Sequence, residues 1–177
     1  MKGVSVQFFR RIPATVYAIG SLVSIALVIF RQPLFSGEIV NATDIITQSF
    51  FWNVFLKENF LTDLSFQTWL PYINAGTPFM GPLDALFRPI NFLTLLLFPV
   101  ETGLNIEMIV YFVSSAIGMY FYMRELRVSA LSAFLAALFF MLNGEIVTLM
   151  NAGHVNKIGA IFPIFKKIGV KSRLIVF

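Results

Sequence analysis

The chain has 177 residues, of which 58% are hydrophobic and 12% are charged, and its mean hydropathy is +0.81. So much apolar surface cannot be hidden inside a soluble globule of 20.0 kDa, so the composition predicts a membrane protein. The absence of cysteine excludes disulfides, thiolate metal sites and cysteine nucleophiles. The net charge of +4 reflects basic residues at the two ends and at one internal turn, which favours membrane orientation and argues against nucleic-acid binding.

The first predicted element is a membrane span over residues 12–30. This run of 19 residues carries no charge, and as a helix rising about 1.5 Å per residue it would extend roughly 28 Å, close to the hydrocarbon thickness of a bilayer. A cleavable signal peptide is the alternative, but its apolar core is normally shorter and is followed by a small-residue cleavage site. Arg31 follows here, so the sequence favours a retained anchor.

Residues 31–105 are predicted to form one large extracytoplasmic loop that contains its own helices. Good helix N-caps occur at positions 41–44, so we expect a helix over residues 41–59, whose aromatic side chains suit the lipid headgroup region. The prolines and glycines of residues 64–82 predict an ordered, turn-rich segment. The apolar run 89–100 is too short to span a bilayer, so it should be re-entrant or lie on the membrane.

Two further spans are predicted over residues 106–123 and 128–144, separated by a short turn that contains two arginines. The positive-inside rule places this turn and the amino terminus in the cytoplasm and the loop 31–105 outside. Residues 1–165 would then be a single all-α, polytopic membrane domain with about three transmembrane helices. The basic residues 166–177 would form a separate tail.

Asp44 is the carboxylate that we single out, because it follows the first span at the expected start of a helix. A carboxylate there is also a favourable N-cap, and the two roles are compatible. His154, the only histidine, lies three residues before Lys157, so the two would share a helix face if that segment is helical. Arg88 and Lys157 could each neutralise a phosphate, although lipid headgroups are the alternative partners of both.

Three patterns, in this order, resemble the amino-terminal part of the YfhO-like bacterial membrane proteins. They are D-x-x-x-Q at Asp44 and Gln48, F-x-x-W-L-P-Y-x-x-A-G-T-P around Trp69, and N-A-G-H-x-x-K at residues 151–157. That family is similar to the GT-C superfamily of polytopic glycosyltransferases, which use polyprenyl-phosphate sugars and carry an essential acidic residue in the first extracytoplasmic loop. The resemblance covers about residues 10–163 and implies a multi-pass protein of the bacterial inner membrane.

The resemblance implies transfer of a sugar from a polyprenyl-phosphate donor to a cell-envelope acceptor, with Asp44 as the catalytic carboxylate. A sugar phosphate leaves as a weakly basic anion, so one base is enough, unlike the two carboxylates of glycoside hydrolases. Asp44 would deprotonate the acceptor hydroxyl or help to hold a divalent cation, and no other cofactor is expected. The predicted substrate-binding residues are Gln48, Trp69, Arg88, His154 and Lys157.

The chain departs from that family in two respects. Relatives have more spans, and they continue as apolar helix after Pro163, where this chain has Lys166, Lys167, Lys171 and Arg173. We therefore expect a truncated or frame-shifted fragment, which a further apolar reading frame downstream of codon 165 would reveal. The alternative function is a non-catalytic membrane transport or assembly subunit, or an inert fragment, whose loop around Trp69 would dock a partner.

Overall fold

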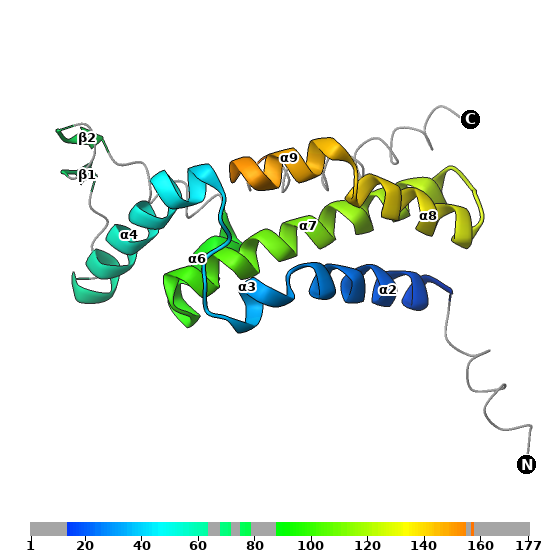
Figure 1. Ribbon diagram of the computed structural model, residues 1–177, viewed down its shortest axis with the longest axis horizontal. Coiled ribbons are helices and arrows are strands. Elements are labelled where there is room, and N and C mark those ends of the chain that lie inside the picture. The colour runs from blue at the N-terminus through cyan, green and yellow to red at the C-terminus, as the bar shows by residue number, and fades with distance from the viewer. Residues whose placement is uncertain (1–13, 64–67, 72–74, 79–87, 155–156, 158–177) are drawn as a thin grey trace, which may run out of the picture. The chain divides into compact units, whose positions relative to one another are not determined.

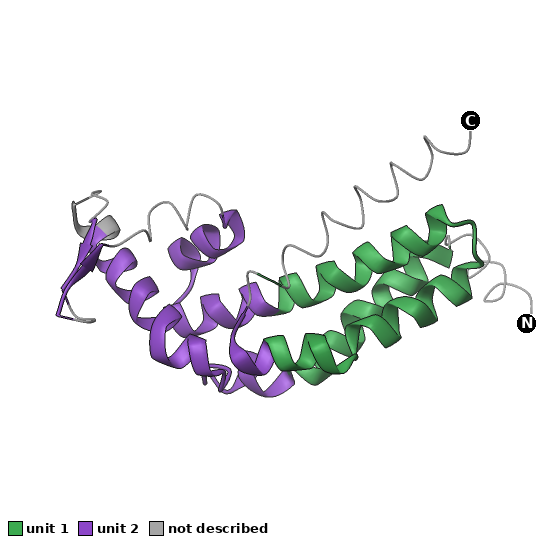
Figure 2. Cartoon of the chain, turned by 90° about the horizontal axis from the view of Figure 1, so that it is seen from above, with its two compact units in different colours: residues 1–30, 109–149, 155–177 green, residues 31–108, 150–154 purple. Residues whose placement is uncertain are grey.

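The computed structural model describes residues 14–63, 68–71, 75–78, 88–154 and 157, and these are mainly α-helical (Figure 1), which confirms the predicted all-α class. The chain divides into two compact units (Figure 2). Unit 1 comprises residues 1–30, 109–149 and 155–177, and unit 2 comprises residues 31–108 and 150–154. Unit 2 therefore contains the whole predicted loop, whereas most residues of the three predicted spans belong to unit 1.

Unit 1 is built from helices whose contacts are mainly apolar. They are α2 (Ala14–Ile29), the later part of α7 (Val100–Glu125), α8 (Ala130–Met141) and the first part of α9 (Gly144–Ala152). Helices α2 and α8 contact each other. Each of them buries residues four apart, which lie on one face of a helix: Leu22 and Ala26 on α2, and Ala133 and Ala137 on α8. The three alanines among these residues are small enough to let helices approach closely.

Aromatic side chains make further contacts in unit 1. The ring of Phe30 meets that of Phe112 edge to face, with 5.3 Å between the centroids. Tyr120 is fully buried, and its hydroxyl lies 3.2 Å from the hydroxyl of Thr15, which joins α7 to α2. A buried tyrosine usually finds such a partner for its hydroxyl group.

Among the described helices, α7 is by itself long and apolar enough to cross a membrane. It contains the predicted span 106–123, but it begins six residues earlier, at Val100, so the end of the predicted loop is helical. Helix α2 has 16 described residues and is shorter than a span. Helices α8 and α9 meet the requirement only as a pair bent by 41°. The described residues thus support one or two crossing helices, and the three-span arrangement stays a prediction.

The predicted span 128–144 corresponds to α8, which is shorter than predicted and has a capping side chain near each of its ends. Ser129 has an extended backbone, and its hydroxyl accepts a hydrogen bond from the Ser132 N–H at the start of α8. Asn143 Oδ1 accepts from the Ile146 N–H at 2.8 Å and so caps α9. Capping side chains of this kind satisfy the free N–H groups of a first turn. Helix α8 therefore covers only residues 130–141.

Unit 2 holds shorter elements connected by turns. They are α3 (Arg31–Phe35), the π-helix η1 (Ile45–Ser49), α4 (Phe50–Asp63), the strands β1 (Trp69–Leu70) and β2 (Thr77–Pro78), and α6 (Pro89–Leu97). Helices η1 and α4 confirm the predicted helix over 41–59, and α6 confirms a helix in the run 89–100, with proline in its first turn. The strands pair antiparallel, with Trp69 opposite Pro78, within the predicted turn-rich segment.

Candidate functional site

Asp44 and His154 come together in unit 2 although they are far apart in the sequence. His154 Nδ1 lies 3.0 Å from Asp44 Oδ2. The side chains of both residues are 37% exposed, so the pair lies at the surface of the unit and is open to another molecule. This is the principal outcome for the predicted site, because the predicted catalytic carboxylate and one of the predicted substrate-binding residues form one pair.

Asp44 stands at the N-cap position of η1, as predicted, but its side chain does not cap the helix. The backbone of Asp44 is already helical, with φ −72° and ψ −24°, and its side chain makes no capping hydrogen bond. A capping residue normally has an extended backbone and accepts from an N–H of the first turn. The carboxylate instead faces His154. The segment that follows is the π-helix η1, in which the Phe50 N–H donates to the Ile45 carbonyl, and π-helical turns are often found at functional sites.

Gly153 allows His154 to reach Asp44. Its φ of +85° is left-handed, a conformation that glycine adopts readily and other residues rarely. A Cβ atom at this position would lie 2.9 Å from the Ile45 backbone nitrogen and 3.2 Å from the Asp44 Cβ. The turn after α9 therefore packs directly on the start of η1, and only glycine fits there.

His154 and Lys157 would share a helix face only if their segment were helical, and that condition is not met at His154. Helix α9 ends at Ala152, and His154 follows the left-handed Gly153 outside any helix. Lys157 is exposed and belongs to unit 1, whereas His154 belongs to unit 2. The structure consequently pairs His154 with Asp44 and does not pair it with Lys157.

The segment that leads to Asp44 is fixed by the buried side chain of Asn105 on α7. Its Nδ2 donates to the carbonyls of Pro33 at 3.0 Å and Glu38 at 2.8 Å, and its Oδ1 accepts from the Val40 N–H at 3.0 Å. Asn105 is only 1% exposed. One amide thus satisfies three backbone groups of an irregular segment, which would otherwise be costly to bury. The approach to Asp44 is held in one conformation.

Arg88 is bound within the protein, by the carboxylate of Glu107. Its Nε donates to Glu107 Oε1 at 2.9 Å, and its Nη2 donates to Oε2. The side chain of Glu107 is fully buried, and that of Arg88 is 13% exposed. Asn91 Nδ2 donates to the same carboxylate at 2.9 Å. This bidentate arrangement uses the guanidinium fork that phosphate binding would need, so Arg88 primarily joins α6 to α7.

The other predicted substrate-binding residues of unit 2 lie on separate elements. Gln48 is an exposed residue of η1, four positions after Asp44. Trp69 is 55% exposed on β1. The ring of Trp69 covers Gly76, since a Cβ there would lie 2.6 Å from a ring carbon, and Gly76 has a φ of +103°. Trp69 therefore has a fixed place on the hairpin.

The described residues contain no group of three or more histidine, aspartate or glutamate side chains that could hold a metal ion. Asp44 and His154 offer two ligands. Mg²⁺ is usually held by one or two carboxylates together with substrate phosphates and water. A divalent cation at Asp44 would therefore take most of its ligands from the donor phosphate and from water, and Asp44 fits that limited role.

Three residues that fix parts of unit 2 were not predicted from the sequence: Glu107, Asn105 and Gly153. Glu107 and Asn105 are polar residues in the first turns of an apolar helix, and such residues need buried partners. Their position in an apolar helix is the sequence signal that could have identified both residues. Gly153 directly precedes the only histidine, and a glycine there is a signal for a left-handed turn. None of these signals identifies the partner.

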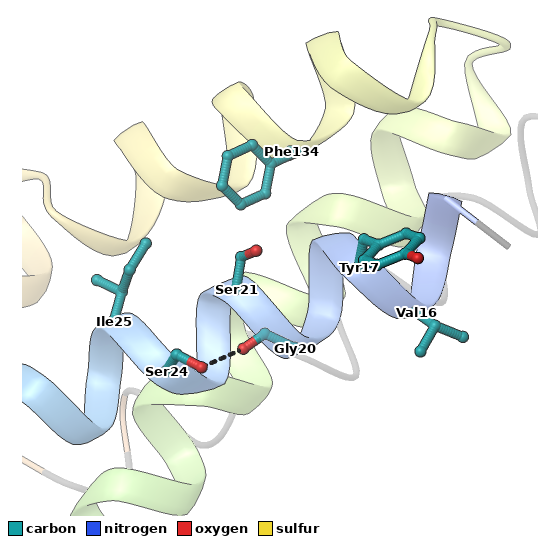
Figure 3. Close-up of a pocket in the computed structure, with 7 residues that line it drawn as sticks. All are labelled: Val16, Tyr17, Gly20, Ser21, Ser24, Ile25 and Phe134. Carbon is teal, nitrogen blue, oxygen red and sulfur yellow. Dashed lines mark hydrogen bonds between the residues drawn. The ribbon is translucent and has the colours of Figure 1, made fainter. Parts of the chain in front are cut away.

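A shallow, open groove lies between α2 and α8 in unit 1 (Figure 3). It encloses about 620 Å³, and Phe134 of α8 faces the small residues of α2 across it. Its lining residues are Val16, Tyr17, Gly20, Ser21, Ser24, Ile25 and Phe134. The Ser24 hydroxyl donates to the Gly20 carbonyl within its own helix. A largely apolar groove of this kind suits packing more than sugar chemistry.

The Asp44 and His154 pair offers a carboxylate and an imidazole in contact, a combination that can accept a proton from a hydroxyl group. Comparisons with family models, curated proteins and solved structures gave no match for this chain. The chemistry of this pair and the elements that hold it are therefore the basis on which a function is proposed.

Proposed function

We propose that the protein is a membrane glycosyltransferase-like enzyme that transfers a sugar from a polyprenyl-phosphate donor to a cell-envelope acceptor. The single observation that carries this proposal is the contact of 3.0 Å between Asp44 and His154 at an open surface of unit 2. The enzyme would lie in the bacterial inner membrane with three spans, its amino terminus in the cytoplasm and unit 2 outside.

The setting of Asp44 supports this role. Its carboxylate is not used to cap a helix, and it lies beside an imidazole. Asn105 holds the chain before it, and Gly153 packs against it from the other side. A catalytic group has to be held in one geometry by its surroundings, because a small displacement is costly to rate. Asp44 meets that requirement with neighbours that are themselves buried or sterically fixed.

The other predicted substrate-binding residues differ in whether they are exposed to a substrate. Gln48 and Trp69 are exposed in unit 2 and remain proposed contacts for the sugar or the acceptor. Lys157, exposed in unit 1, remains a proposed contact for phosphate. Arg88 is assigned a supporting role, because its fork is bound to Glu107. The membrane lipids would solvate the apolar helices and carry the donor.

The test is transfer of a radiolabelled sugar from a polyprenyl-phosphate donor to envelope acceptors in membranes that contain the full chain. Asp44→Asn should reduce transfer by about 100-fold or more, the usual loss when acid–base catalysis is disabled, because it removes the carboxylate of the Asp44 and His154 pair. The matched control is Glu38→Gln, which removes an exposed carboxylate of the same unit and should leave transfer unchanged. Unchanged transfer by Asp44→Asn, at equal membrane abundance, would remove Asp44 from the reaction.

A non-catalytic membrane transport or assembly subunit is the second candidate, and the exposed Trp69 favours it. An aromatic ring that is 55% exposed and fixed over Gly76 is a typical anchor for a partner. This function predicts that Trp69→Ala lowers the amount of a partner retained in a pull-down, while Asp44→Asn has no effect on it. Loss of sugar transfer by Asp44→Asn, with partner retention intact, would decide for the enzyme.

A further inference from the structure

We infer that Asp44 and His154 work as one acid–base unit, in which Nδ1 of the neutral imidazole carries the proton and donates a hydrogen bond to the Asp44 carboxylate. Nε2 is then the atom that accepts a proton from a reacting hydroxyl group. The pairing and the position of the proton concern the protein alone. The role of Nε2 in sugar transfer rests on the function proposed above.

The geometry of the contact indicates which ring nitrogen of His154 carries the proton. Nδ1 faces Asp44 Oδ2 at 3.0 Å, which is within the range of a hydrogen bond between nitrogen and oxygen. A carboxylate can only accept hydrogen bonds, and a neutral imidazole has one donor and one acceptor nitrogen. The contact is therefore favourable when the proton is on Nδ1. The lone pair is then on Nε2, on the other side of a ring that is more than a third exposed.

The backbone sets the position of the ring. His154 follows Gly153, whose left-handed conformation and close approach to Ile45 fix where the chain passes Asp44. Asp44 is fixed in turn by its helical backbone at the start of η1. An imidazole held by a carboxylate keeps one tautomer and one orientation, and the same carboxylate stabilises the imidazolium that forms when a proton arrives. Asp44 is thus a positioning residue, and His154 is the base.

The reaction step can be written so that it balances. The acceptor O–H proton moves to His154 Nε2 as the acceptor oxygen forms a bond to the anomeric carbon. The bond from that carbon to the phosphate oxygen breaks, and its electron pair leaves with the polyprenyl phosphate. The imidazolium, paired with the Asp44 carboxylate, later returns its proton to solvent. No oxidant, reductant or further reactant is needed.

The sole histidine makes the position of the proton measurable without any substrate. The full chain is labelled with ¹⁵N-histidine in detergent micelles, and the two ring nitrogens are observed at about pH 8.5, on the alkaline side of the range in which histidine side chains change charge. The wild type should show the tautomer with the proton on Nδ1. Asp44→Asn should shift it towards Nε2, because an amide can donate to Nδ1 as well as accept from it.

Two further variants make this measurement decisive. Glu38→Gln should give the wild-type spectrum, since it removes a carboxylate that is not paired with the ring. Gly153→Ala should weaken the Nδ1 tautomer, because the added Cβ meets the Ile45 nitrogen at 2.9 Å. A wild-type spectrum with the proton on Nε2, identical to that of Asp44→Asn, would overturn the pairing.

The transfer assay then separates this inference from the proposed function. His154→Gln should lower kcat by about 100-fold with little change in KM for the donor, because a base acts in the transition state. If the wild type transfers sugar and His154→Gln transfers it equally well, His154 is not the base although the proposed function stands. If the wild type transfers no sugar but its ring shows the Nδ1 proton, the proposed function fails and the pairing stands.

Discussion

The two units of this chain are stabilised by different kinds of contact. In the described part of unit 1, the buried residues are mostly alanine, leucine, methionine and aromatic side chains, and small residues let α2 and α8 touch. In unit 2, a glutamate and two asparagines are less than 5% exposed: Glu107, Asn91 and Asn105. Among the described residues, no buried side-chain nitrogen or oxygen lacks a hydrogen-bond partner.

This difference is what we expect if unit 1 is a scaffold and unit 2 holds the candidate site. Apolar contacts have no direction, so they tolerate small shifts and specify geometry only through shape. Hydrogen-bonded networks fix atoms relative to each other, and a half-satisfied network is worse than none. Unit 2 contains irregular backbone, a π-helix and a left-handed glycine next to Asp44, all of which need such restraints. The unit with the candidate chemistry is the one with buried polar side chains.

Glu107→Leu should have the largest effect on stability. It removes the carboxylate that Arg88 and Asn91 both contact, and removing one partner of a buried ion pair costs about 3–5 kcal/mol. The free energy of unfolding is measured by denaturant titration in detergent. Arg88→Met combined with Glu107→Leu should recover a large part of the loss, because no guanidinium then remains without its carboxylate.

The matched control for this variant is Glu101→Leu. Glu101 lies in the first turn of the same helix and is partly exposed, and its charge interacts with the helix dipole by less than about 1 kcal/mol. If both substitutions lower the free energy of unfolding by the same amount, the buried pair stabilises unit 2 no more than an exposed carboxylate does. The contrast between the units would then lie in their backbones alone.

Two glycine-to-alanine substitutions sharpen the same contrast. Gly153→Ala should destabilise the protein by about 2 kcal/mol, because a left-handed backbone is strained for any residue with a Cβ, and the new atom meets Ile45. Gly20→Ala in α2 should stabilise it by about 0.5–1 kcal/mol, because alanine is the better helix former and its Cβ meets nothing within 4 Å. Both changes in the free energy of unfolding are measured by the same denaturant titration. A change of the same sign in the two variants would contradict the expectation.

The sequence predicts the helices better than it predicts the site. Hydrophobic runs, N-caps and a proline at the start of α6 locate most elements within a few residues, because these signals are local. The break at Leu142 and Asn143 falls at the predicted end of the span 128–144, but an apolar run does not show that a side chain will cap a new helix there. Helix α9 and the bend of 41° between α8 and α9 were not predicted.

The site was predicted as residues and not as contacts. The sequence predicts both Asp44 and His154 as site residues, but it offers an N-cap role for the carboxylate and a helix face shared with Lys157 for the histidine, and not their contact with each other. Their contact depends on a turn after α9 that returns the chain to η1, and no local pattern encodes such a long-range approach. Arg88 was named for phosphate because an exposed arginine is a good phosphate ligand, whereas its buried partner Glu107 is known only from the fold.

The least perturbing prediction compares the sidedness of the two units. The chain has no cysteine, so a single introduced thiol reports its own position. Thr43→Cys lies beside Asp44 at an exposed position of unit 2, and Leu126→Cys lies in the arginine-containing turn of unit 1, where the native side chain is 45% exposed. The positive-inside rule predicts that a membrane-impermeant maleimide labels the first in intact spheroplasts and the second only after permeabilisation.

Neither substitution should change stability by more than about 0.5 kcal/mol, because both positions are at the surface. The labelling pattern therefore reports sidedness without a change in the fold. If Thr43→Cys were labelled only after permeabilisation, Asp44 would face the cytoplasm, away from any envelope acceptor. The pairing with His154 would be unaffected, but the proposed sugar transfer to an acceptor outside the membrane would have to be abandoned.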